Sequence, residues 1–387
     1  MHRTGLDALW AGLFAAVVTF ALTPVFARVA KRVGAVDQPR DRGLSERPTP
    51  LLGGVAIFAG AGGATAIWLL GGHEQWAAIL WGAGIITLVG ALDDIFDLPA
   101  PVKLAGQIGA VLPPVLTGVN VDHFTFPFLG HVDLGGAGKP LTILGFVAII
   151  NVVNLSDGID GLAAGVCAIS AVALSIVAFD LNKGPAGVLA AITAGAALGF
   201  LIHNFHPASV FMGDCGSNLL GYLLGATAVQ GTLKTNALVA IVAPLVVLAV
   251  PFLDTTFVVL KRMKYRRPIY VADTNHFHHR FSRIGFSQVR TVLYLYGWTA
   301  CLAGLAVALR FVPYTDHHGH YNAGWTAVML FLGLLVLLAS VYLVYVLEIL
   351  KFRRFLRNRQ PERTHEEVDD DVRRAMETGE FEAISRE

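Results

Sequence analysis

Long apolar stretches recur along the chain and are separated by short polar segments. A helix needs about 20 apolar residues to cross a bilayer, and most of these stretches approach that length. The pattern predicts an all-α integral membrane protein with about eleven transmembrane helices, the fifth being the shortest. The predicted spans are 5–27, 51–71, 76–92, 103–119, 141–154, 159–179, 185–203, 216–232, 236–260, 291–312 and 324–350.

Basic residues lie almost entirely in the segments that would face one side of the membrane. The loops after spans 1, 3, 5, 7 and 9, the tail, and Lys103 at the start of span 4 account for 24 of the 29 Lys and Arg residues. Cytoplasmic loops carry such an excess, so the bias places the N-terminus outside and the C-terminus in the cytoplasm. The loops 28–50 and 261–290 and the tail carry most of this charge.

The composition agrees with a membrane protein and excludes several other classes. Hydrophobic residues make up 55% of the chain and charged residues only 15%, whereas a soluble domain has about 25% charged residues. That share is too small for a soluble globule of this size or for a disordered chain. The formal net charge of +1 gives no support for a nucleic-acid partner. The three cysteines form neither a disulfide framework nor a zinc motif.

Residues 1–350 form the predicted membrane domain, and two segments are expected to lie outside the bilayer. One is a loop within this domain and the other is the tail that follows it. Residues 120–140 alternate apolar and polar positions around Gly130, which predicts a small hairpin on the outer face. Residues 351–387 begin basic and become acidic, with a run at 369–371. We interpret this tail as a solvated, partly helical cytoplasmic segment.

Polar side chains gather at the span ends and loops of the predicted cytoplasmic face. Acidic residues at membrane depth are costly, so such a concentration indicates a functional site. The contributing groups are Asp93, Asp94 and Asp97; Asn151, Asn154, Asp157 and Asp160; Asp214; and His276, His278 and His279. The predicted orientation uses Lys and Arg alone. The gathering of these Asp, Asn and His residues on the same face is therefore independent evidence for a site there.

The residue types in these groups favour a magnesium ion bound beside phosphate groups. Carboxylate and amide oxygens are hard ligands, and Mg²⁺ keeps several waters while it bridges to substrate phosphates. Asp93 and Asp97 share one helical face because they are four residues apart. Lys103 and the basic loops supply positive charge for a polyanionic substrate. A helix cap with solvated acids is the alternative interpretation of residues 93–97, and loop solvation that of the histidines.

Five motifs occur in order within residues 10–350, all on the predicted cytoplasmic face. They are DQPRDRGLSERPTPLLGG (37–54), DDIFD followed by KLAGQ (93–107), NVVNLSDGIDGLAAG (151–165), FMGDCGS (211–217) and HFHHR (276–280). Together they resemble the motifs of the polyprenyl-phosphate N-acetylhexosamine-1-phosphate transferases, which belong to glycosyltransferase family 4. One such motif would be weak, but five in the same order are specific.

The resemblance implies a multi-pass enzyme of the bacterial inner membrane with its active site on the cytoplasmic face. Such an enzyme transfers a sugar 1-phosphate from a UDP-N-acetylhexosamine to undecaprenyl or decaprenyl phosphate and releases UMP. The resemblance also implies bound Mg²⁺, with Mn²⁺ as the alternative metal. By position, Asp214 and Asn154 match the magnesium ligands, and Asp93 and Asp94 match an essential acidic pair. We therefore expect Asp93, Asp94 and Asp214 to be catalytic.

The same comparison of motifs assigns the substrate contacts. Lys103 matches a lysine that contacts phosphate, and Phe211 matches a residue that stacks on uracil. The remaining matches line the nucleotide-sugar cleft, and they are Asp157, Asp160, His276, His278, His279 and Arg280. Gly43 and Ser45 depart from the family's usual lysine and histidine, so contacts at these two positions are not carried over. Arg42 and Arg47 are the expected substitutes.

The histidine motif favours one branch of the family. HFHHR resembles the branch that uses UDP-N-acetylglucosamine, whereas the peptidoglycan branch tends to have adjacent histidines followed by a glutamate. Here Arg280 and Phe281 follow instead. We expect the protein to transfer N-acetylglucosamine 1-phosphate in the first membrane step of the synthesis of a cell-envelope polysaccharide. A phospho-N-acetylmuramoyl-pentapeptide transferase is the alternative.

Two other classes use similar residues. A membrane prenyltransferase also binds magnesium through acidic motifs, but it leaves Asn154, the FMGD motif and the histidines unexplained. A membrane transporter would have charges near the bilayer midplane and discontinuous spans, whereas the charges of this chain gather at one predicted interface. A homodimer is one of the oligomeric states that the sequence leaves open.

Overall fold

The computed structural model describes residues 4–38, 48–71, 73–126, 130–233, 286–312 and 322–359, with isolated positions between 249 and 256. The chain divides into two compact units. The first holds residues 1–270 and 295–311, and the second holds residues 271–294 and 312–387. Each unit is described by itself.

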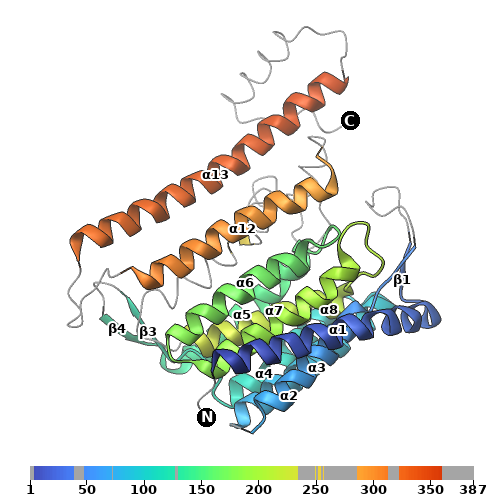
Figure 1. The fold of residues 1–387 in the computed structure, drawn as a ribbon, viewed down its shortest axis with the longest axis horizontal. Coiled ribbons are helices and arrows are strands. Elements are labelled where there is room, and N and C mark those ends of the chain that lie inside the picture. Colours follow the sequence, from blue (N-terminus) through green and yellow to red (C-terminus); the bar gives the residue numbers. More distant parts are fainter. Residues whose placement is uncertain are drawn as a thin grey trace. The chain divides into compact units, whose positions relative to one another are not determined.

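Helices account for almost all of the regular structure (Figure 1). In the first unit they are α1 (Gly5–Val33), α2 (Gly53–Trp68), α3 (Glu74–Phe96), α4 (Ala100–Leu116), α5 (Gly138–Ser156), α6 (Leu162–Asp180), α7 (Gly184–Asn204) and α8 (Gly213–Ala228). A π-helical turn, Val229–Leu233, extends α8. Two further helices are α12 (Gln288–Phe311), which crosses the boundary between the units, and α13 (Ala323–Arg359) of the second unit.

A helix lies at ten of the eleven predicted spans, and the ninth span, 236–260, falls almost wholly outside the described residues. Within the described part, seven helices are long and apolar enough to cross a membrane. The shorter apolar helices α2 and α4 have 16 and 17 residues. The protein is therefore a mostly helical multi-pass membrane protein, and the count of eleven spans and the orientation stay predictions.

Two short antiparallel ribbons connect the helices. The first pairs β1 (Val36–Asp37) with β2 (Thr49–Pro50), with Val36 opposite Pro50. The second pairs β3 (His123–Phe126) with β4 (Gly130–Asp133). This second ribbon confirms the hairpin predicted within residues 120–140.

Helix α8 is the central helix of the first unit. It packs against α2, α3, α5, α6 and α7, and every side chain from Cys215 to Ala228 is buried. Small residues let its neighbours approach closely, as is usual for helices in lipid. A Cβ on Gly221, for example, would lie 2.7 Å from the Cα of Ile150 on α5. The first turn of α8, which carries Asp214, is therefore held in the middle of the bundle.

Candidate active site

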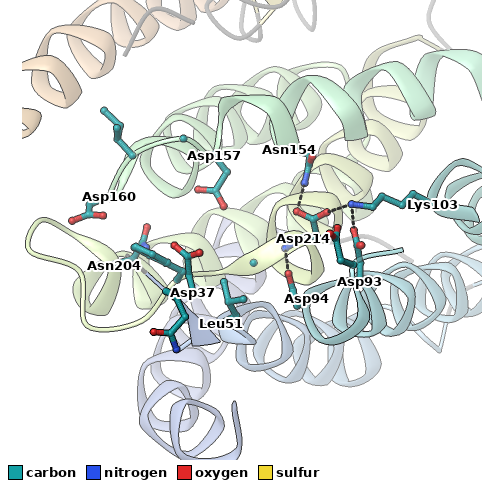
Figure 2. A pocket seen from close by; sticks show the side chains of 16 residues that line it. Asp37, Leu51, Asp93, Asp94, Lys103, Asn154, Asp157, Asp160, Asn204 and Asp214 are labelled. Atoms are coloured by element: carbon teal, nitrogen blue, oxygen red, sulfur yellow. Dashed lines mark hydrogen bonds and ion pairs between the residues drawn. The ribbon is translucent and has the colours of Figure 1, made fainter. Parts of the chain in front are cut away.

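A cleft of about 550 Å³ opens at the end of the first unit where α8 begins (Figure 2). The end of α3, the start of α4, the end of α5 and the loop before α6 all contribute to its wall. The lining residues are Asp37, Gln38, Leu51, Asp93, Asp94, Asp97, Lys103, Asn154, Asp157, Gly158, Ile159, Asp160, Asn204, Phe211, Gly213 and Asp214. Seven of these sixteen side chains are carboxylates, so the cleft is suited to a bound cation.

Asp93 and Lys103 face each other across the turn between α3 and α4. One oxygen of the buried Asp93 carboxylate accepts a hydrogen bond from the Leu98 N–H at 2.8 Å. The other oxygen lies 2.7 Å from the Lys103 Nζ. The α3 helix ends at Phe96, and the capping residue after it, Asp97, has a left-handed φ of 51°. This short turn brings the first turn of α4 back against Asp93.

Asp214 completes a cluster with this ion pair, as the dashed lines in Figure 2 show. Its Oδ2 lies 3.5 Å from the Lys103 Nζ, and its Oδ1 accepts a hydrogen bond from the Asn154 Nδ2 at 2.9 Å. The same Asn154 nitrogen donates to the Ser217 Oγ, also at 2.9 Å. Burial alone would raise the pKa of Asp214, but hydrogen bonds with Asp93 and Asn154 and the charge of Lys103 hold that pKa below its usual range.

Asp94 holds the beginning of α8 instead of facing Lys103. Its two oxygens accept hydrogen bonds from the backbone N–H groups of Asp214, at 2.7 Å, and Cys215, at 3.2 Å. A carboxylate is favoured at the N-terminus of a helix, where backbone N–H groups lack partners. Gly213 allows this approach, because its φ of 68° is left-handed and a Cβ there would overlap the Asp94 carboxylate. The two adjacent aspartates thus have different surroundings.

The loop between α5 and α6 forms another wall of the cleft and carries Asp157 and Asp160. Burial raises the pKa of Asp157 to about 8, and the charges of Asp214, Asp94 and Asp160 add to the shift. The Asp160 Oδ2 lies 2.7 Å from the His206 Nδ1 and accepts a hydrogen bond from the Ala208 N–H at 3.0 Å. The segment after α7 therefore holds Asp160 in place.

The segment that carries Phe211 is tied to the ribbon at the start of α2. The Phe211 N–H donates to the Pro50 carbonyl at 2.9 Å, and the Gly53 N–H donates to the Phe211 carbonyl at 3.1 Å. The next residue, Met212, accepts a hydrogen bond from the Gly54 N–H at 2.9 Å. These bonds place Phe211 beside Leu51 in the cleft wall.

The structure brings together most of the residues that the sequence predicted for the site. The predicted residues in one cleft are Asp93, Asp94, Asp97, Lys103, Asn154, Asp157, Asp160, Phe211 and Asp214. Eight further residues of the predicted site lie outside the described residues, and they are Arg42, Gly43, Ser45, Arg47, His276, His278, His279 and Arg280. The sequence also grouped Asn151 with Asn154, Asp157 and Asp160. Its side chain pairs instead with Gln107, and the Asn151 Nδ2 lies 2.7 Å from the Gln107 Oε1.

The sequence predicted no individual role for several lining residues, among them Asp37, Gln38, Leu51 and Asn204. Asp37, Gln38 and Leu51 belong to the motif at 37–54, in which only Arg42, Arg47, Gly43 and Ser45 have predicted roles or departures from the family pattern. Asn204 is buried, and its amide bonds to the Gly161 N–H and to the Val210 carbonyl, both at 3.0 Å. The signal for Asn204 was its place seven residues before Phe211 in HNFHPASVFMGD.

The donor atoms of the cleft fit a magnesium ion. The described residues contain no cluster of three or more His, Cys, Asp or Glu side chains that would enclose a metal. Mg²⁺ is usually bound by one or two carboxylates, with waters and substrate phosphates as the other ligands. Asp214 and Asp93 supply such carboxylates. Asn154 turns its amide nitrogen toward Asp214, so its predicted role as a ligand would use its Oδ1.

Comparisons with known proteins identify the family. The model of glycosyl transferase family 4 matches residues 76–232. The probable undecaprenyl-phosphate N-acetylglucosaminyl 1-phosphate transferase of Bacillus subtilis is 40% identical over 276 residues, which are 71% of this chain and 77% of the relative. The decaprenyl-phosphate N-acetylglucosaminephosphotransferase of Mycobacterium tuberculosis is 36% identical over 78% of this chain and 82% of the relative.

A relative from the other branch matches at lower identity. The phospho-N-acetylmuramoyl-pentapeptide-transferase of Desulforudis audaxviator is 32% identical over 78% of this chain and 98% of the relative. Relatives of this identity and coverage establish membership. The chain belongs to glycosyl transferase family 4.

Proposed function

We propose that the protein transfers N-acetylglucosamine 1-phosphate from UDP-N-acetylglucosamine to a polyprenyl phosphate and releases UMP. The observation that carries the proposal is the cluster of Asp93, Lys103 and Asp214 at the mouth of a membrane-embedded bundle. This cluster offers both a cation for phosphate groups and carboxylates for a metal. The names of the Bacillus and Mycobacterium relatives supply the donor sugar and the lipid acceptor.

The reaction exchanges one phosphoanhydride bond for another. An oxygen of the lipid phosphate attacks the phosphorus that carries the sugar, and the bond from that phosphorus to the UMP oxygen breaks. We infer direct attack without a phosphorylated enzyme, because a phosphate monoester is already mostly dianionic at pH 7. Catalysis then depends on alignment and on charge neutralisation. Lys103 would contact the phosphates, and its ion-pair partner Asp93 would orient the lipid phosphate or accept a residual proton.

Magnesium is the metal that we propose for this site, and Mn²⁺ is the alternative. Asp214 would hold it together with Asp93 or the Asn154 Oδ1. When bound, the ion neutralises diphosphate charge and stabilises UMP as the leaving group. Asn154 has a second role that needs no metal, because its amide fixes the Asp214 carboxylate and the Ser217 hydroxyl.

The other end of the cleft is proposed to bind the nucleotide sugar. Phe211 would stack on uracil, and Asp157 and Asp160 would line the donor site with the predicted contacts His276, His278, His279 and Arg280. Figure 2 shows Asp157 and Asp160 away from Lys103, on the far side of Asp214. Two separate ends suit a donor and a lipid acceptor that would meet beside Asp214.

The choice of donor rests on two observations. The motif HFHHR lacks the glutamate of the peptidoglycan branch, and the pentapeptide transferase of Desulforudis has a lower identity than the Bacillus relative. We therefore propose the N-acetylglucosamine branch, in the bacterial inner membrane with the cleft facing the cytoplasm. The pentapeptide transferase is the second candidate.

Release of UMP by purified protein in detergent tests the proposal. The wild type is expected to release UMP from UDP-N-acetylglucosamine only when polyprenyl phosphate and Mg²⁺ are both present. Asp214→Asn is expected to abolish this release. Glu74→Gln, at the exposed opposite end of α3, is the matched control and should keep wild-type activity. UMP release without lipid, or an active Asp214→Asn variant, would contradict the proposed site.

A further inference from the structure

Tyr296 of α12 contacts the backbone at the end of the loop that carries Asp157 and Asp160. Its hydroxyl donates a hydrogen bond to the Gly161 carbonyl, with the two oxygens 2.5 Å apart. The N–H of the same residue, Gly161, donates to the Asn204 Oδ1 at 3.0 Å. Both polar backbone groups of Gly161 therefore bond to side chains from other helices.

The Gly161 carbonyl is also the first acceptor of α6. It accepts a hydrogen bond from the Gly165 N–H at 3.0 Å, so the Tyr296 hydroxyl is a second donor to the same oxygen. Gly161 itself has a φ of 79°, in the left-handed region, and its position turns the chain from the loop into the helix. A bond at this carbonyl fixes the point where the loop ends.

The Tyr296 ring is seated in a notch on α6. A Cβ added to Gly165 would overlap both the ring and the hydroxyl of Tyr296. A Cβ on Gly161 would lie 3.3 Å from the same hydroxyl. Because the two glycines are four residues apart, they lie on one face of the helix. The notch and the hydrogen bond together define where the ring can sit.

We propose that Tyr296 is a positioning residue for the donor end of the cleft. Four residues of the loop, Asp157 to Asp160, line the cleft, and Gly161 follows them directly. Asp160 is anchored separately by His206 and Ala208. Tyr296 anchors the backbone of the next residue, Gly161, where this short segment meets α6. The assignment of this wall to the nucleotide sugar rests on the proposed function.

The variant Tyr296→Phe removes the hydroxyl and keeps the ring that fills the notch. One hydrogen bond contributes about 1 kcal/mol, which corresponds to about a fivefold change. We expect the KM for UDP-N-acetylglucosamine to rise about fivefold, while kcat and the KM for polyprenyl phosphate stay within twofold. Gly165→Ala pushes the ring out of the notch and is expected to raise the donor KM at least as much.

Tyr222→Phe is the matched control. The Tyr222 hydroxyl is buried and, like the Tyr296 hydroxyl, donates to a backbone carbonyl, that of Ile79, at 3.0 Å. Ile79 lies near the start of α3, fourteen residues before Asp93 at the cleft. Tyr222→Phe should lower the thermal midpoint without changing either KM. Equal donor KM values in Tyr296→Phe and Tyr222→Phe would overturn the proposal, because Tyr296 would then contribute to stability alone.

Amide hydrogen exchange of the peptide covering 155–165 separates this inference from the proposed function. Tyr296→Phe is expected to accelerate exchange of these amides about fivefold under native conditions. Tyr222→Phe should leave them unchanged. If the wild type releases no UMP from UDP-N-acetylglucosamine, the proposed function is wrong, and the exchange data still decide the positioning role. Unchanged exchange in Tyr296→Phe would overturn it.

Discussion

Gly213→Ala tests whether the contact between Asp94 and the start of α8 sets the position of Asp214. The added Cβ would overlap the Asp94 Oδ2 and lie 2.7 Å from its Cγ. The Asp94 carboxylate would have to move away from the Asp214 and Cys215 N–H groups, from which it now accepts hydrogen bonds. The backbone of Asp214 would lose its anchor, while every side chain of the proposed metal site would be unchanged.

The magnitude follows from two contributions. Alanine in the left-handed region costs about 1–2 kcal/mol, and a hydrogen bond to a charged group contributes about 1.5–3 kcal/mol. Loss of the 2.7 Å bond together with the strain predicts a fall of about 2.5–5 kcal/mol in the free energy of unfolding. A shift of Asp214 by about 1 Å predicts a loss of about 100-fold in kcat.

Gly135→Ala is the control for strain alone. Gly135 also has a positive φ, 48°, but a Cβ there meets nothing within 4 Å. It lies before α5, at the opposite end of that helix from Asn154. Thermal midpoints and rates of UMP release are measured for both variants in the same detergent. Gly135→Ala should lose about 1–2 kcal/mol and keep its activity. Equal activity in the two variants would refute the role given to Asp94.

Three further predictions concern two side chains of the cleft and its proposed metal. Lys103→Gln should lower kcat/KM by about 100-fold, because it removes the cation between Asp93 and Asp214. The control Lys139→Gln, on an exposed residue, should have no effect, and a loss below threefold in Lys103→Gln would contradict the assignment. The raised pKa of Asp157, about 8, means that the folded state binds more protons, so this group costs stability as pH rises from about 4 to about 8. In the absence of substrate and metal, Asp157→Asn should therefore raise the thermal midpoint more at pH 8.5 than at pH 5, and an equal rise at both would contradict it. EDTA should abolish UMP release and Mg²⁺ should restore it, and activity that survives EDTA would exclude an exchangeable metal.

The helices were largely predictable from the sequence because lipid imposes a simple length rule. Predicted span 76–92 became α3, Glu74–Phe96, and span 185–203 became α7, Gly184–Asn204. Span 216–232 begins three residues after α8 does, since Gly213 and Asp214 are polar or small and hydropathy does not detect them. The first turn of α8 depends on Asp94, a tertiary contact that no local pattern reveals.

The membership of the site was also predictable, but the roles within it were not. Asp93 and Asp94 are adjacent and chemically identical, yet one faces Lys103 and the other caps α8. Asn154 matched a metal ligand by motif, whereas its amide nitrogen faces Asp214. Tyr296 lies in an apolar span, where one tyrosine gives no signal of its partner on α6. Such roles depend on which atoms of neighbouring helices meet.

The most direct test of the central claim is the identity of the lipid product. Folded protein in detergent would receive polyprenyl phosphate, Mg²⁺ and equal amounts of UDP-N-acetylglucosamine and UDP-N-acetylmuramoyl-pentapeptide, and the lipids would be analysed by mass spectrometry. We predict polyprenyl-diphospho-N-acetylglucosamine as the product, formed in equal amount with UMP. Formation of the pentapeptide-bearing lipid would move the protein to the other branch of the family. A folded protein that forms neither lipid would contradict the proposed reaction.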